Sequence, residues 1–113
     1  MNRGDVYQAA LSPTQGSEQS GTRPVIIVSR DALNAVSSVV LVVPVTGREN
    51  KRRIYPSQLE IKAHDGGLTK DSVALCEQTR AVSKSRLTKR LGRLHLGTIA
   101  ALNATLKITL DLP

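Results

Sequence analysis

The chain has 113 residues, the usual size of one domain and enough to bury a hydrophobic core without disulfide or metal support. Sixteen Lys and Arg against nine Asp and Glu give a net charge of +7, which is typical of nucleic-acid-binding proteins, although an exposed basic surface or an acidic protein partner would also account for it. One Cys excludes an intramolecular disulfide and a Cys-rich zinc cluster, and two Tyr with neither Trp nor Phe argue against sequence-tolerant binding of single strands by aromatic stacking.

The N-terminal residues lack the segments of a secretory signal, and no apolar run approaches the ~20 residues that span a bilayer. We therefore expect one domain over residues 1–113, located in the cytoplasm and without membrane contact. Cys76 lies in a short apolar stretch, which favours a buried thiol over a reactive one.

Short runs of apolar and β-branched residues predict several strands. They occupy residues 6–11, 24–29, 39–45, 54–61 and 72–76. The run VVLVVPV at residues 39–45 is the most apolar, which predicts a strand buried on both faces that ends close to Thr46 because Pro44 interrupts the ladder. Residues 47–53, GRENKRR, predict an exposed, mobile loop.

Two segments favour helices. Residues 30–36 predict a short helix, and residues 96–110 predict the best helix of the chain. The apolar face of that helix comprises Leu96, Ile99, Ala100, Leu102, Asn103 and Leu106. Residues 83–94 stay ambiguous, because the Leu spacing fits a helix while Thr88 and Gly92 weaken one. Many strands and one terminal helix predict a compact, mostly β barrel or sandwich.

A long polar loop precedes Arg23, which is joined through Pro24 to an apolar strand. Functional residues are often found on such loops, and a guanidinium held by a strand is suited to binding phosphate oxygens. An ordinary salt bridge, for example to Glu18, is the alternative.

Two further strand ends present polar side chains. The hydroxyl of Thr46 could bind a phosphate oxygen or cap a turn. Glu77 could take a proton from a ribose hydroxyl, or form an ion pair, which we consider the more common role. Neither His64 nor His95 has metal-ligand spacing, and no nucleotide-binding loop is present, so we expect no metal and no cofactor.

Taken together, these segments resemble the MazF/PemK/Kid family of toxin endoribonucleases from bacterial toxin–antitoxin pairs. The similar pieces, in order along nearly the whole chain, are residues 3–7 (RGDVY), 11–14 (LSPT), 16–19 (GSEQ), 21–25 (GTRPV), 43–46 (VPVT), 72–80 (SVALCEQTR) and 84–87 (KSRL).

The resemblance implies a small SH3-like, CcdB-type β-barrel with short helices and a C-terminal α-helix. It also implies a homodimer that cuts single-stranded RNA at short sequences without a metal, through attack of the ribose 2′-hydroxyl on the adjacent phosphate. A non-catalytic binding toxin of the same fold, such as a topoisomerase poison, is the alternative.

By position, the resemblance places the family's catalytic arginine at Arg23 and its threonine at Thr46. Kid-like members have an arginine and an aspartate where this chain has Leu75 and Glu77. The chain therefore resembles the MazF branch more closely, and the general base stays open between Thr46, Glu77 and a water molecule.

Polar and basic side chains around these positions are expected to bind the RNA. The candidates are Ser17, Glu18, Gln19, Gln78 and Arg80, together with Arg48, Lys51, Arg52 and Arg53 of the basic loop. The net charge of +7 also suits an acidic, MazE-like antitoxin that covers the same groove.

Overall fold

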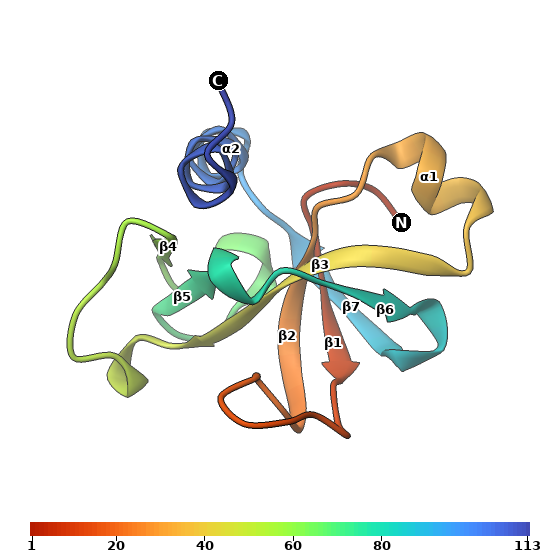
Figure 1. Cartoon of the computed structure of the whole chain (residues 1–113), viewed down its shortest axis with the longest axis horizontal. Helices are drawn as coiled ribbons and strands as arrows, with labels where there is room; N and C mark the ends of the chain where they lie inside the picture. Colours follow the sequence, from red (N-terminus) through yellow and green to blue (C-terminus); the bar gives the residue numbers. More distant parts are fainter.

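The computed structural model describes all residues, 1–113, as one twisted sheet with two α-helices, which both lie along its upper side in Figure 1. The strands are β1 (Asp5–Ala10), β2 (Thr22–Ile27), β3 (Val39–Gly47), β4 (Gln58–Ile61), β5 (Ser72–Leu75), β6 (Arg80–Ser83) and β7 (Leu87–Arg93). The α-helices are α1 (Asp31–Val36) and α2 (Leu96–Leu110), and the short 3₁₀ turns are η1 (Arg48–Asn50), η2 (Asp65–Gly67), η3 (Cys76–Gln78) and η4 (Lys84–Arg86).

The sheet is antiparallel throughout, with the strand order β4-β5-β3-β2-β1-β7, and β6 pairs with β3. The expected mostly β fold with a C-terminal helix is confirmed. The barrel is not closed, however, because the outer strands β4 and β7 do not pair with each other.

The long strand β3 joins the two parts of the sheet. Its first half pairs with β6, its middle with β2 and its last residues with β5. The expected burial on both faces holds from Val42 onward but is wrong for the first residues, where Val39 and Leu41 are exposed because no layer covers that face. The strand ends at Gly47, close to Thr46 as expected, although Pro44 lies within the ladder opposite Val25.

Two apolar clusters fill the interior on either side of β3. One comprises Val6, Ile26, Val43, Val45, Ile61, Leu68, Ala74, Cys76, Leu94 and Leu102, so α2 packs against it. The other comprises Ala9, Leu11, Val25, Ile27, Val40, Val42 and Val82. Alternate residues of β2 and β3 point into different clusters, as the period of two in a strand requires.

Helix α2 begins where the sequence predicts, and a distant side chain caps it. Asp65 is only 6% exposed, and its carboxylate accepts hydrogen bonds from the backbone N–H of His95 at 2.8 Å and from the Thr98 hydroxyl at 2.5 Å. A carboxylate at a helix N-terminus satisfies free N–H groups and complements the helix dipole. The expected apolar face is too wide, because Leu96 is 78% exposed and Asn103 is also in solvent.

Residues 54–61 differ from the sequence-based expectation, and the ambiguous residues 83–94 are resolved. Only Gln58–Ile61 of the predicted strand at residues 54–61 pairs, with β5. Residues 83–94 form η4 and then strand β7, since backbone pairing with β1 outweighs the helical spacing of the Leu residues. No helix of the structure is long and apolar enough to cross a membrane.

Candidate active site

A pocket of about 320 Å³ lies where the start of β2 meets the end of β3. The polar and charged side chains that line it include Gln8, Arg23, Thr46, Asn50, Lys70 and Ser72. Arg23 and Thr46, which the sequence places 23 positions apart, therefore face the same cavity. The pairing of β2 with β3 brings them together.

Arg23 is half-buried and held by the loop that precedes it. Its Nε donates to the carbonyl of Ser20 at 3.1 Å, and its backbone pairs with Ala9 of β1. Arg23 forms no ion pair, and the Glu18 carboxylate instead accepts from the backbone N–H of Gln15 at 2.5 Å. The alternative of a salt bridge to Glu18 is therefore wrong, and the two terminal nitrogens of Arg23 stay available to a ligand.

Thr46 is 6% exposed and presents its hydroxyl to the pocket from within β3. The Oγ1 atom accepts a hydrogen bond of 3.0 Å from Nδ2 of Asn50 in η1. Sequence reasoning missed Asn50. The one signal for it was the turn-forming composition after Thr46, since Asn side chains commonly bond to groups a few residues away in turns.

Lys70 is a second cation in this pocket, and sequence reasoning missed it too. Its Nζ lies 2.5 Å from Oε1 of Glu49 in η1, with both side chains more than half exposed. The hydrogen bond from Lys70 is the main cause that lowers the pKa of Glu49. This ion pair neutralises Lys70, so Arg23 is the unpaired cation of the pocket.

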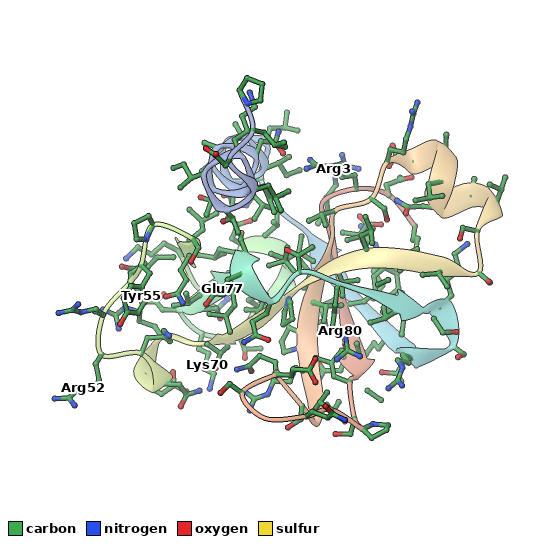
Figure 2. All side chains as sticks on the ribbon, viewed as in Figure 1. Arg3, Arg52, Tyr55, Lys70, Glu77 and Arg80 are labelled. Carbon is green, nitrogen blue, oxygen red and sulfur yellow. The ribbon has the colours of Figure 1, made fainter.

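Glu77 does not line the pocket of Arg23 and Thr46. It belongs to a second pocket of about 310 Å³, and its carboxylate accepts hydrogen bonds from Nε2 of Gln58 at 2.6 Å and from the Ser57 hydroxyl at 3.2 Å. Glu77 lies in η3, the turn that follows β5, and is labelled in Figure 2. The expected ion pair of Glu77 is therefore wrong, because its partners are neutral donors.

The second pocket gathers four of the nine expected RNA-binding residues, which come from the β1–β2 loop, η3 and the start of β6. Ser17, Glu18, Gln78, Thr79 and Arg80 line it beside Glu77. Gln78 fastens the loop: its Nε2 donates to the carbonyl of Ser17 at 3.1 Å, and its Oε1 accepts from the backbone N–H of Gln19 at 3.3 Å. The buried Oε1 of Gln19 has no hydrogen-bond partner.

The basic loop is more ordered than its composition indicates. Arg48 donates from Nη1 to the carbonyl of Lys51 at 2.6 Å, and its Nε lies 3.5 Å from Oε2 of Glu60. Lys51 and Arg53 each lie 5.8 Å from the centre of the Tyr55 ring. Arg52 alone points freely outward at the edge of the molecule (Figure 2). None of these four basic residues lines the pocket of Arg23 and Thr46.

The single thiol takes no part in either pocket. Cys76 is buried, as expected, and burial followed by the nearby Glu77 charge raises its pKa to about 11. The thiol therefore packs in the core in its neutral form.

Solved structures with the same fold come from toxins of several bacteria. An endoribonuclease in complex with its cognate antitoxin, from a mycobacterial species, matches with a TM-score of 0.82 and 27% identity over 100% of this chain and 97% of that one. MazF from Deinococcus radiodurans matches with a TM-score of 0.83 and 27% identity over 98% and 96% of the two chains. A MazE–MazF structure from the same organism gives 0.77 and 25%, over 100% and 97%.

A sequence relative is considerably more similar than these structures. The Endoribonuclease MazF of Staphylococcus saprophyticus is 46% identical over 112 residues, which cover 99% of this chain and 92% of the relative. Residues 2–110 match the family model described as PemK-like, MazF-like toxin of type II toxin–antitoxin system. The chain therefore belongs to the PemK-like, MazF-like toxin family of type II toxin–antitoxin systems.

Proposed function

We propose that this protein is the toxin of a toxin–antitoxin pair and an endoribonuclease that cuts single-stranded RNA at short specific sequences. The observation that supports this most directly is the shared pocket, in which the free end of the Arg23 guanidinium and the Thr46 hydroxyl face one cavity. The endoribonuclease that is 46% identical over nearly the whole chain supports the same activity.

The reaction is a transesterification that needs donors around one phosphate. The ribose 2′-hydroxyl gives its proton to a base and attacks the adjacent phosphorus, and the bond to the 5′ oxygen breaks. That oxygen takes up a proton from a water molecule or from the Arg23 guanidinium, and the products are a 2′,3′-cyclic phosphate and a 5′-hydroxyl end. The unpaired guanidinium of Arg23 stabilises the charge that develops on the phosphate oxygens. Thr46 donates its hydroxyl hydrogen to the same group. Neither role requires a metal ion.

The proton of the 2′-hydroxyl goes to a base that is Thr46, Glu77 or a water molecule. Glu77 lines the neighbouring pocket, and both its carboxylate oxygens already accept hydrogen bonds from Ser57 and Gln58. This arrangement favours a water molecule as the base, because Oγ1 of Thr46 already accepts from Asn50 while its hydrogen faces the phosphate, and Glu77 acts on the flanking nucleotide.

In this proposal, side chains of the second pocket bind the RNA bases, and the basic loop attracts the RNA phosphate backbone. Ser17, Glu18, Gln19, Gln78 and Arg80 offer donors and acceptors to the edges of unstacked bases, the usual mode of sequence-specific RNA recognition. Arg48, Lys51, Arg52 and Arg53 supply charge for the phosphates that leave the pockets.

In the cytoplasm, the protein would bind an acidic antitoxin and a second copy of its own chain. The solved relatives in complex with an antitoxin support the first of these. An acidic segment would compete with RNA for the same cationic surface of a chain with a net charge of +7.

A cleavage assay in EDTA tests this function. Purified protein incubated with a long single-stranded RNA should yield discrete fragments with 5′-hydroxyl ends and 2′,3′-cyclic phosphates. An RNA with one 2′-deoxynucleotide at the mapped site is the matched control and should stay intact there. Intact RNA in the presence of folded protein, with or without added divalent metal, would contradict the proposal.

A further inference from the structure

Asn50 reaches the pocket from the turn that follows β3, and its side chain makes one hydrogen bond. Nδ2 of Asn50 donates to Oγ1 of Thr46 at 3.0 Å, and both residues line the pocket of Arg23. Thr46 is almost fully buried, and its hydroxyl makes no other hydrogen bond within the protein.

The backbone of η1 is held in place without the Asn50 side chain. The N–H of Arg48 donates to the carbonyl of Asp71 at 2.9 Å, and the N–H of Lys51 donates to the carbonyl of Arg48 at 3.1 Å. The ion pair between Glu49 and Lys70 ties the same turn to the segment before β5. The amide of Asn50 is therefore not needed to form the turn, and its contact with Thr46 requires another explanation.

A threonine hydroxyl has one hydrogen to donate and two lone pairs that accept. Because the Asn50 amide donates to this oxygen, the Thr46 hydrogen cannot point at Asn50 and is free to turn toward the cavity. We propose that Asn50 is a positioning residue that directs the Thr46 hydroxyl hydrogen toward the scissile phosphate. This inference rests on the proposed function, since it assigns a role to Asn50 only through Thr46.

Two substitutions of Asn50 distinguish the role of its amide as a hydrogen-bond donor from the role of its side-chain volume. Asn50→Asp keeps the shape but offers only acceptor oxygens, so the Thr46 hydroxyl would donate to the carboxylate instead of the phosphate. Asn50→Ala removes the donor and leaves the hydroxyl free to rotate. Steady-state cleavage of a short RNA, with RNA in excess over enzyme, should show a lower kcat for both, by roughly tenfold for Ala and roughly a hundredfold for Asp.

The same two substitutions in a Thr46→Val background give the decisive comparison. Without the hydroxyl, Asn50→Ala should change kcat by less than about twofold, because residues that act as a unit are not additive. Asn103→Ala is the matched control: this exposed Asn of α2 lies outside the pocket of Arg23 and should cleave at the wild-type rate. Urea unfolding midpoints should be similar for all the Asn50 variants.

Other results would refute the role of Asn50, the role of Thr46 or the nuclease function, and the experiment distinguishes these cases. Full cleavage by both Asn50 variants, where Thr46→Val is impaired, would overturn the role of Asn50 and leave the nuclease function intact. Equal losses with and without the Thr46 hydroxyl, or a change in KM alone, would also overturn it, because Asn50 would then act through the turn or its own contact with RNA. Full activity of Thr46→Val would remove both assignments, and no cleavage by the wild type would instead refute the proposed function.

Discussion

Arg23 shows how one side chain can be both anchored and available. Its Nε donates to the carbonyl of Ser20, and this bond orients the planar guanidinium while the terminal nitrogens face the pocket. A guanidinium fixed before the substrate arrives does not have to reorganise as negative charge develops, which is the basis of electrostatic stabilisation of a transition state. The nearby Lys70 differs, because Glu49 already neutralises it.

Arg23→Lys tests whether this orientation matters beyond the charge. Lysine keeps the positive charge but has neither the planar fork nor the Nε–H that bonds to Ser20. We expect kcat for RNA cleavage to fall by about 10²-fold, with a smaller change in KM. The protein should stay folded, as circular dichroism can confirm. Wild-type kcat would show that any positive charge at this position suffices.

Cys76 should be unreactive in the folded protein. Its pKa is raised to about 11, mainly by burial, so at pH 8 the nucleophilic thiolate is scarce. Alkylation by iodoacetamide, followed by mass spectrometry, should be much slower in buffer than in urea. The unfolded chain loses this proton near pH 9, whereas the folded protein keeps it, so the thiol should reduce stability as the pH rises from 9 toward 11. Equal alkylation rates would contradict the buried position.

At the scale of elements, β3 organises the molecule because it pairs with β6, β2 and β5 in turn. Its C-terminal end holds Thr46 and leads into η1, so the strand that anchors both apolar clusters also fixes one wall of the pocket. The carboxylate of Asp65 plays a comparable role for α2, which it joins to η2.

Asp65→Ala should destabilise the protein by about 1–2 kcal/mol, the usual cost of losing a side-chain cap at a helix N-terminus. The substitution leaves the N–H of His95 and the Thr98 hydroxyl without their acceptor. Urea unfolding should show the loss as a lower midpoint with an unchanged slope. Asp65→Asn, which keeps one oxygen acceptor, should lose less. A midpoint equal to that of the wild type for Asp65→Ala would refute the capping role.

The sequence predicts the local elements better than their long-range partners. The apolar runs correctly place the cores of β1, β2, β3 and β5, since a buried strand requires such residues whatever it pairs with. Strand β7 was ambiguous because its pairing with β1 depends on residues 78 to 88 positions away. In the site, Arg23 and Thr46 could be predicted from the family motifs, whereas Asn50 and Lys70 could not, because their positions depend on how η1 and the segment before β5 fold against β3.

The whole molecule combines a net charge of +7 with an uneven distribution of free cations. Several basic side chains are already paired within the protein, among them Arg48 with Glu60, Lys70 with Glu49 and Arg90 with Asp5. Arg52 in the basic loop is exposed and unpaired (Figure 2). These pairs already cancel within the net charge of +7, so the number of phosphates that the protein can neutralise depends on which of its cations, such as Arg52, stay unpaired.

Salt dependence of RNA binding can count those phosphates. For single strands the logarithm of the binding constant falls with the logarithm of salt concentration by about 0.7 for each phosphate contact. Arg52→Gln should reduce this slope by about that amount. The slope is measured by fluorescence anisotropy with an RNA that a 2′-deoxynucleotide at the cleavage site makes resistant to cleavage. In a separate assay with cleavable RNA, the substitution should leave kcat unchanged. An unchanged slope would show that the outer end of the basic loop does not contact the backbone.

The open sheet also leaves β7 with a free edge, a site at which strands of other chains could add. Three of its seven residues are Lys89, Arg90 and Arg93, and long charged side chains on an edge strand discourage such pairing. The same positive charge that suits an RNA-binding toxin therefore also keeps copies of the molecule from aggregating through their backbones. Substitutions that replace these residues with apolar ones would lower solubility before they altered the fold.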